Sequence, residues 1–95
     1  MKNLSINRNI QRTSRFLKDL KKLDSIIQIE AYNVSIKLSE NIFHPELNIK
    51  KLTGFENTYR VVVLKDNRLI YSFDKENIYL LKISHRKDIY KKFEI

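Results

Sequence analysis

The stretch from Tyr59 to Tyr90 constrains the fold most strongly, because it contains three apolar runs separated by short polar breaks. The runs are rich in Val, Ile, Leu, Tyr and Phe, which are the residues favoured in β-strands. The breaks are Lys65-Asp66-Asn67 and Asp74-Lys75-Glu76-Asn77, and polar breaks of this length between apolar runs are typical of consecutive hairpins. The stretch therefore predicts a three-stranded antiparallel meander.

The segment before this meander has the residue spacing of two helices. From Ile10 to Leu23 the apolar side chains recur at helical spacing and charged residues fill the other positions, so we predict an amphipathic helix. Ser25, with Gln28 three positions later, fits a capping box that begins a second helix. A proline excludes the α region for the residue before it, so this helix is expected to end at Phe43-His44-Pro45. The apolar stripe of the second helix consists of Ile27, Ala31, Val34, Leu38 and Ile42.

The remaining segments have weaker patterns. Leu4-Ser5-Ile6-Asn7 alternates between apolar and polar residues, as a short edge strand does. The segment from Glu46 to Thr58, which contains the only glycine, is predicted to be a partly extended connection. After the last strand, Ile89 and Phe93 are four positions apart, which suits either a short helix or an extended tail. Together, the elements predict an α+β fold in which an N-terminal helical hairpin packs on one face of a small antiparallel sheet, followed by a short C-terminal helix or tail.

The length of the first hairpin loop decides which residues share a face of the sheet. If Lys65-Asp66-Asn67 is a three-residue loop, Leu64 pairs with Arg68, and Arg60 lies on the same face as Arg68. A two-residue loop would place the two arginines on opposite faces. With the longer loop the other face is almost wholly apolar and is expected to carry the helices. The residues of that apolar face are Tyr59, Val61, Val63, Leu69, Tyr71 and Phe73.

Composition limits the classes of protein that fit. Ninety-five residues suit one folded domain, so we expect residues 1–95 to form a single domain. The absence of cysteine excludes disulfides, thiolate metal sites and cysteine-based catalysis. No apolar run has the length of a signal peptide or a membrane span, so we expect a cytoplasmic protein without a membrane partner. The net charge of +8 suits a polyanionic partner such as nucleic acid, or an acidic protein.

The last part of the meander contains residue types that suit metal-independent RNA cleavage. When a 2′-hydroxyl attacks the adjacent phosphate, a base takes its proton, an acid protonates the leaving oxygen, and fixed positive charge stabilises the transition state. Histidine or tyrosine can transfer the protons, and the planar fork of arginine can hold the phosphate. Carboxylates are scattered and a single glycine excludes the phosphate-binding loops, so neither a metal nor a cofactor is expected. Taken alone, however, Arg60, Arg68 and His85 have the simpler interpretation of solvated surface residues.

Five segments, in their order and spacing, resemble the RelE/ParE superfamily of toxins from toxin–antitoxin systems, and the RelE-like branch in particular. The resemblance covers most of the chain, from about Arg15 to Tyr90. It implies a compact domain with two helices packed on a small antiparallel sheet, which agrees with the periodicity. The segments are FLKDLKKL (Phe16 to Leu23), KKLTG (Lys50 to Gly54), YRVVV (Tyr59 to Val63), NRLIYSF (Asn67 to Phe73) and ISHRKDIY (Ile83 to Tyr90).

The resemblance also implies an activity and a site. It implies a metal-independent endoribonuclease that cleaves mRNA, commonly in the ribosomal A site, and that is held in check by an antitoxin encoded beside it. The implied catalytic residues are Arg68, His85, Arg86 and Tyr90, and the implied RNA- or phosphate-binding residues are Arg60, Lys50 and Lys51. Tyr90 corresponds to a tyrosine that helps to activate the 2′-hydroxyl, and His85 to a residue with an acid–base role. The chain departs from the pattern at Val62, where RelE has a lysine, so the identities of the general base and general acid stay open.

Two other functions fit the same resemblance. ParE-like members of the superfamily bind and inhibit DNA gyrase and need no nuclease site, whereas the ribonuclease hypothesis needs the pair Arg86 and Tyr90. A non-catalytic module that binds RNA or protein is the third hypothesis, and Val62 is the residue that suggests it. In either toxin class, the basic surface and exposed sheet edges suit an acidic antitoxin segment that folds when it binds.

Overall fold

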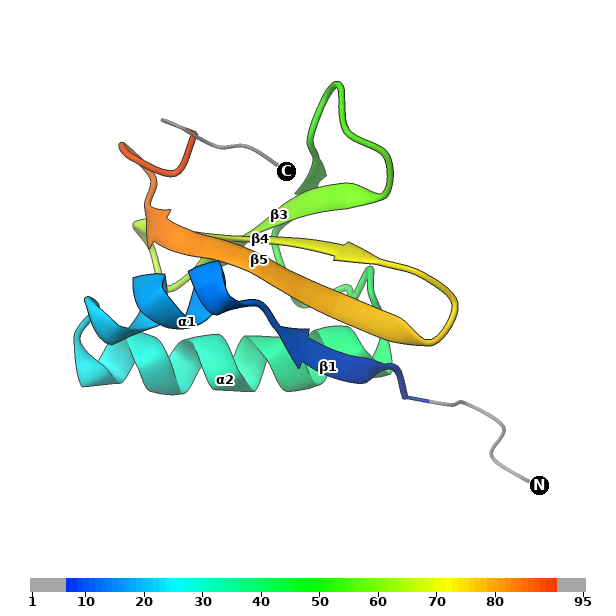
Figure 1. Ribbon diagram of the computed structural model, residues 1–95, viewed down its shortest axis with the longest axis horizontal. Coiled ribbons are helices and arrows are strands. Elements are labelled where there is room, and N and C mark those ends of the chain that lie inside the picture. Colours follow the sequence, from blue (N-terminus) through cyan, green and yellow to red (C-terminus); the bar gives the residue numbers. More distant parts are fainter. Residues whose placement is uncertain (1–6, 91–95) are drawn as a thin grey trace.

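The computed structural model describes residues 7–90, in which two helices pack against a five-stranded mixed sheet (Figure 1). The strand order is β1-β5-β4-β3-β2; β1 is parallel to β5, and the other neighbours are antiparallel. The predicted α+β class is confirmed, whereas the prediction of a purely antiparallel sheet is wrong. Neither helix in the described range is long and apolar enough to cross a membrane. The elements are β1 (Asn9–Arg12), α1 (Ser14–Lys21), α2 (Ser25–Glu40), β2 (Ile49–Lys51), β3 (Thr58–Val63), β4 (Asn67–Phe73) and β5 (Asn77–His85).

Strands β3, β4 and β5 form the predicted meander, but the first hairpin has a different register. Its loop is Leu64-Lys65-Asp66, so Arg68 pairs with Val62 and not with Leu64. Leu64 has a φ of 52°, which closes the turn in the left-handed region. The register differs from the predicted one by two positions, and such a shift leaves every side chain on its original face. The predicted sharing of a face by Arg60 and Arg68 is therefore correct even though the predicted pairing is wrong.

The beginning of the chain differs most from the prediction. Residues 10–12, expected to open the first helix, instead belong to β1, which pairs with the outer edge of β5. The apolar helical stripe begins only at Phe16, so nothing in the spacing required helix before Thr13. The predicted edge strand at Leu4–Asn7 lies almost entirely outside the described residues, and Asn7 itself is not in a strand.

Helix α2 begins where predicted, but the capping box is absent. Asp24 is the N-cap residue, and the side-chain amide of Gln28 instead donates to the carbonyls of Leu20 and Leu23, at 3.0 and 2.9 Å. Gln28 therefore joins the end of α1 to the start of α2 and satisfies carbonyls that a helix end leaves without partners. The helix ends at Glu40, before the predicted proline signal, because Asn41 is extended and its side chain accepts from the backbone N–H of Phe43.

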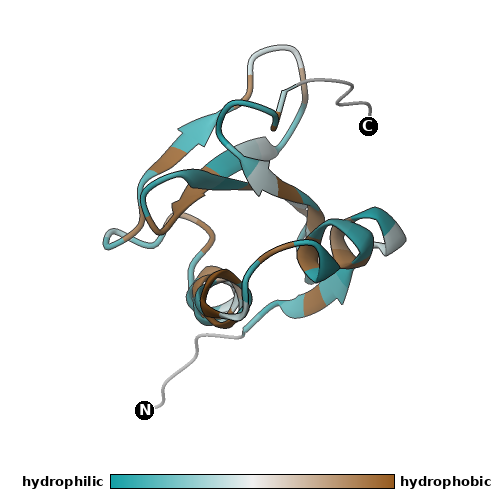
Figure 2. Cartoon of the chain, turned by 90° about the vertical axis from the view of Figure 1, so that its left-hand side faces the viewer, coloured by the Kyte–Doolittle hydropathy of each residue, from teal (hydrophilic) through white to brown (hydrophobic). Residues whose placement is uncertain are grey.

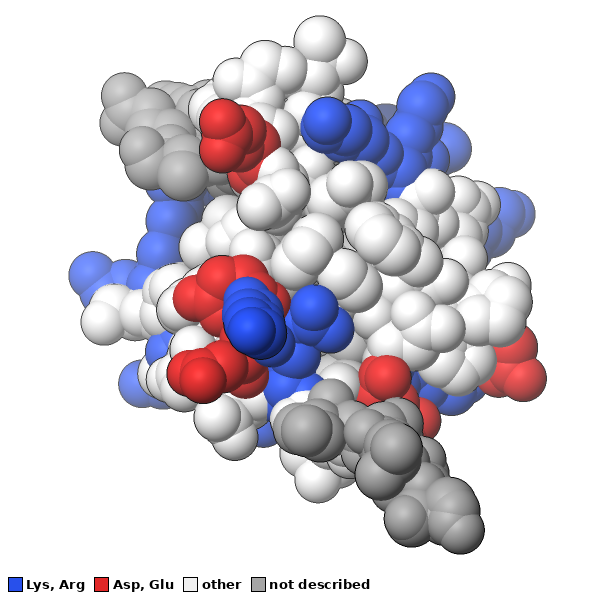
Figure 3. Space-filling model, turned by 90° about the vertical axis from the view of Figure 1, so that its right-hand side faces the viewer, with Lys and Arg blue, Asp and Glu red and all other residues white. Residues whose placement is uncertain are grey.

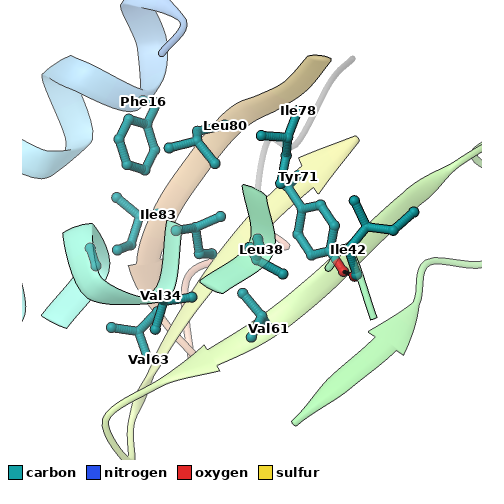
Figure 4. Close-up of a cluster of buried hydrophobic side chains, with 12 residues drawn as sticks. Phe16, Val34, Leu38, Ile42, Val61, Val63, Tyr71, Ile78, Leu80 and Ile83 are labelled. Atoms are coloured by element: carbon teal, nitrogen blue, oxygen red, sulfur yellow. Dashed lines mark hydrogen bonds between the residues drawn. The ribbon is translucent and has the colours of Figure 1, made fainter. Parts of the chain in front are cut away.

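The hydrophobic core lies between the helices and the sheet (Figure 4). Phe16 and Leu38, from the two helices, are almost fully buried against strand residues of the predicted apolar face. Tyr71 lies in this core, and its hydroxyl donates to the carbonyl of Ile42 at 2.6 Å. Burial is the main cause of the raised pKa of Tyr71. The core also contains Ala31, Val34, Ile42, Val61, Val63, Leu69, Ile78, Leu80 and Ile83.

Two segments that the sequence left open also have defined structures. The connection between α2 and β3 contains strand β2, which extends the sheet beyond β3. Gly54 in the following loop has a φ of 91°, a conformation that side chains disfavour. Residues 86–90 after β5 form turns rather than a helix, and within them Ile89 is fully buried.

Thr13 connects strand β1 to helix α1, and its removal tests this junction. Its hydroxyl donates to the carbonyl of Leu80 at 2.8 Å and accepts from the N–H of Phe16 at 3.2 Å. We expect Thr13→Ala to lower the free energy of unfolding by about 1–2 kcal/mol, since both bonds are lost. Urea denaturation measures the change. Thr13→Ser is the control, because it keeps the hydroxyl; a loss as large as that of Thr13→Ala would contradict the assignment.

Candidate functional site

The face of the sheet that the helices do not cover carries a row of basic residues. We call it the helix-free face. Cross-strand pairing aligns Lys50, Arg60, Ile70 and Lys82 from β2 to β5 in one row. Ile70 is fully buried and Lys82 nearly so, and the accessible positive charge of this row therefore belongs to Lys50 and Arg60. The neighbouring row consists of Val62, Arg68 and Ser84. None of the strand positions on this face in β2 to β5 is an Asp or Glu, so the charges fixed on it are positive.

The positive charge is not spread evenly over the whole molecule. Figure 3 shows another side, where a broad uncharged area lies between basic and acidic side chains.

Of the two lysines predicted to bind phosphate, Lys50 pairs with Arg60 on the helix-free face, whereas Lys51 pairs with Tyr59 and so lies on the opposite face of the sheet. The structure therefore places Lys50, but not Lys51, with the arginines.

Arg60 and Arg68 lie on this face and are oriented by backbone carbonyls. Nη1 of Arg60 donates to the carbonyl and the side-chain oxygen of Asn48, at 3.1 and 3.2 Å. Nη1 of Arg68 donates to the carbonyls of Lys65 and Asn67, both at 3.1 Å. A guanidinium has five N–H donors, so bonds from one nitrogen fix its orientation while the rest of the fork can meet an anion.

Arg86 is held beside the same hairpin loop as Arg68. Its backbone N–H donates to the carbonyl of Asp66 at 2.8 Å, and its Nε lies 3.7 Å from Oδ1 of Asp66. Because Arg68 binds carbonyls on either side of Asp66, the loop between β3 and β4 brings Arg68 and Arg86 to the same end of the sheet. Tyr90 ends the turn that begins at Arg86, and about half of its surface is exposed.

His85 is at this end of the sheet but points to the other side of it. It pairs with Asn67 and therefore alternates away from Ser84 and Arg68, toward the side of the helices. Its Nδ1 accepts from the backbone N–H of Lys87 at 3.0 Å, so in the neutral ring Nε2 carries the proton. His85 lines a surface cavity of about 300 Å³ together with Asp19, Lys22 and Asp88.

Lys82 is a buried basic residue that the sequence interpretation missed. It lines the same cavity, and only 8% of its surface is exposed. Burial, and then the positive charge of Arg15, lower the pKa of Lys82, while Asp19 acts in the opposite direction. The sequence did contain a signal: within the apolar run NIYLLKIS, this lysine has the same strand parity as Ser84, which lies opposite Arg68.

Asp19 connects helix α1 to the edge of β5 beside this cavity. Its Oδ2 accepts from the backbone N–H of Ile83 at 3.2 Å, which satisfies an edge donor beyond the end of β1. No group of three or more His, Asp or Glu side chains within residues 7–90 has an arrangement that could hold a metal ion.

Comparison with known proteins identifies similar chains. Residues 10–90 match the family model described as the ParE toxin of the type II toxin–antitoxin system parDE. A search by sequence among curated proteins gave no match.

Several solved structures have a similar fold. The RelE–RelB complex from the archaeon Pyrococcus horikoshii matches with 20% identity and a TM-score of 0.73, over 87% of this chain and 99% of that one. The RelB–RelE antitoxin–toxin complex from Methanococcus jannaschii matches with 27% identity and a TM-score of 0.66, over 88% and 99%. The YoeB dimer from Staphylococcus aureus matches with 16% identity and a TM-score of 0.73, over 84% and 98%.

The charge on Lys82 is expected to destabilise the folded protein at neutral pH. The pKa of Lys82 is lower in the folded protein than in the unfolded chain, so the unfolded chain binds this proton more tightly. The charge therefore lowers the free energy of unfolding, and this loss shrinks as the pH rises from the lowered pKa toward 10.5. We therefore expect Lys82→Met to raise the melting temperature at pH 7, and the gain to shrink toward pH 10.5. Lys22→Met, at an exposed position of the same cavity, is the control and should change stability by less than about 0.5 kcal/mol. Equal effects of the two substitutions would contradict the role of burial.

Proposed function

The chain belongs to the ParE toxin family of type II toxin–antitoxin systems, and within the RelE/ParE superfamily of toxins we propose that it acts as an endoribonuclease that cleaves mRNA. The observation that carries the proposal is the position of Arg68 and Arg86, which the loop between β3 and β4 holds at one end of the helix-free face. Two guanidinium groups held by the same loop provide fixed positive charge where a phosphate in the transition state would gain negative charge.

The row of basic residues supports an RNA strand as the ligand of this face. Lys50 and Arg60 are cross-strand partners, and Arg60 is the diagonal neighbour of Arg68, because Arg68 pairs with Val62 two positions along β3. Basic side chains in a row can follow successive phosphates of a single strand. In this proposal Lys50 and Arg60 bind flanking phosphates, while Arg68 and Arg86 bind the phosphate that reacts.

The proposed reaction uses the RNA's own 2′-hydroxyl as the nucleophile. Its oxygen attacks the adjacent phosphorus and loses its proton to a base, while the bond from phosphorus to the 5′-oxygen breaks and that oxygen gains a proton from an acid. The products are a 2′,3′-cyclic phosphate and a free 5′-hydroxyl. The arginines hold the phosphate and stabilise its extra negative charge in the transition state, which is where such interactions increase the rate.

Tyr90 and His85 are the candidates for the proton transfers, and the structure gives them different surroundings. Tyr90 is about half exposed at the end of the turn that begins with Arg86, so its hydroxyl is accessible to a substrate. His85 is adjacent to Arg86 in sequence but faces the cavity beside α1, and its Nε2 is the nitrogen left to contact a substrate. We propose Tyr90 as the group that acts on the 2′-hydroxyl, and we assign no proton transfer to His85, because its side chain lies on the side of the sheet opposite to Arg68.

Gyrase inhibition is the second candidate function, because the matching family model is that of the ParE toxins. That function needs a binding surface but no group that transfers protons. The same helix-free face offers such a surface. Both candidate functions require this fold, but only RNA cleavage requires Arg86 and Tyr90 to take part in the chemistry.

We also propose a cognate antitoxin as the cellular partner, with the ribosome as the place of cleavage. Two of the similar structures are RelE–RelB complexes. A chain with a net charge of +8 and a face that carries basic residues suits an acidic segment that folds on binding and covers the arginines. Such a segment would inhibit the toxin by occupying the positions of the RNA phosphates.

Primer extension on cellular mRNA after brief induction tests the proposal. We expect new 5′ ends within translated regions, and we expect Arg86→Ala or Arg68→Ala to reduce their yield about 100-fold, because each substitution removes transition-state charge. Lys87→Ala is the matched control, since it removes an exposed positive charge next to Arg86 and should leave cleavage unchanged. Growth arrest with intact messages, together with loss of supercoiling by purified gyrase, would contradict RNA cleavage and support the second candidate.

A further inference from the structure

Helix α2 has apolar side chains on its outer side as well as on the side that packs on the sheet. Figure 2 looks along this helix, and much of its ribbon has the brown of hydrophobic residues. The inner side is buried in the core through residues such as Val34 and Leu38. On the outer side Ile26, Ile29 and Tyr32 are 66%, 63% and 56% exposed. A helix that is apolar all round is normally covered on all sides, whereas within residues 7–90 these three side chains on the outer side of α2 stay exposed.

The outer residues have the spacing of a helix-pairing seam. Ile26, Ile29, Asn33, Ile36 and Glu40 follow one another at intervals of three, four, three and four residues. This alternation places them in one line along the helix, as the a and d positions of a coiled coil are placed. Asn33, Ile36 and Glu40 also border a shallow hollow on this surface, into which side chains of a partner helix can fit.

Charged residues on one flank of this seam are arranged to complement a second copy of the same helix. Glu30 and Lys37 are seven positions apart and therefore lie on the same flank. In an antiparallel pair related by a two-fold axis, the residue at one end of the seam meets the residue at the other end in the partner. An axis that passes near Asn33 brings Glu30 of each copy beside Lys37 of the other, so that the ion pair forms twice.

We propose that the outer side of α2 is a homodimer interface, in which α2 packs antiparallel against α2 of a second copy about a two-fold axis near Asn33. The isoleucines of the seam bury one another, and the two Asn33 amides meet at the axis. A polar residue in the middle of an apolar seam favours one register of pairing, here the one in which the two amides meet; within one copy, Nδ2 of Asn33 donates to Oε1 of Glu30 at 3.5 Å. Lys37 also contacts Glu46 of its own chain at 3.3 Å, and this exposed contact holds the lysine near the flank.

The charge of α2 favours a second copy over the acidic partner that suits the helix-free face. Helix α2 contains one lysine and two glutamates, although the whole chain has a net charge of +8. An acidic segment is attracted to the basic surfaces and not to this helix. Two copies of a strongly basic protein repel each other least where their basic residues are fewest, and the outer side of α2 meets this condition.

The seam is short, so the dimer is expected to be weak and to depend on concentration. Three isoleucines and the flanking Tyr32 from each copy give an interface at the small end of specific interfaces. The proposal concerns a different surface from the one proposed for RNA, so it stands or falls independently of the ribonuclease activity.

Sedimentation equilibrium of the purified chain over a range of concentrations tests the proposal. We expect reversible dimers, and we expect Ile29→Glu to weaken dimerisation at least about tenfold, because it places a charge in the apolar seam. Leu17→Glu is the matched control, since Leu17 is an exposed apolar residue of α1, 41% accessible, and lies outside the seam. A monomer at every concentration, or a dimer that Leu17→Glu weakens as much as Ile29→Glu does, would overturn the proposal.

Charge reversal tests the antiparallel register. We expect Glu30→Lys to weaken the dimer about fivefold, since it sets lysine against Lys37 at two places, and we expect addition of Lys37→Glu to restore it. Circular dichroism of each variant checks that the fold is kept. Failure of the double variant to dimerise would overturn the register. If Ile29→Glu abolished binding of the antitoxin while the free chain stayed monomeric, the occupant of α2 would be the antitoxin and the proposal of a second copy would be wrong.

Discussion

The outer edge of β5 needs hydrogen-bond partners along its length, and the way it obtains them organises the rest of the structure. Strand β1 covers the first part of this edge in parallel. At the end of β1, Thr13 binds the carbonyl of Leu80 and begins α1, and Asp19 of that helix then accepts the N–H of Ile83. The segment from β1 through α1 thus changes from strand to helix while it stays along the edge of β5. It satisfies backbone N–H and C=O groups of β5 that could otherwise pair with another chain.

This edge also explains why the N-terminal segment was predicted incorrectly. A four-residue parallel strand with a single apolar residue, Ile10, has no period of its own, so its conformation is determined by the edge it joins. The meander was predictable because β4 is paired on both sides and its alternation is clear. Its register was not, since a shift of two positions keeps the same faces and changes only which residues are neighbours. The cost of the observed register is a left-handed Leu64, which alternation does not reveal.

Strand alternation predicted which residues of the candidate site share a face of the sheet, but it predicted nothing about the contacts between them. Arg60, Arg68 and Lys50 share the helix-free face as strand parity requires, and Lys51 is excluded from it by the same rule. The association of Arg68 with Arg86 depends on backbone carbonyls of the hairpin loop, which no side-chain pattern encodes. The burial of Lys82 depends on the approach of α1 to β5, so it follows from tertiary packing and not from the strand itself.

The two proposed surfaces lie on opposite sides of the molecule, and this separation has a physical consequence. The helices cover one face of the sheet, so the outer side of α2 points away from the helix-free face (Figure 1). A two-fold axis through the α2 seams would place the helices of both copies in the middle and the two basic faces on the outside. Charge repulsion between the basic faces is then smallest because they are as far apart as the assembly allows. Each face would also stay open to a strand of RNA or to an acidic antitoxin, so self-association and the proposed activity need not compete for any residue.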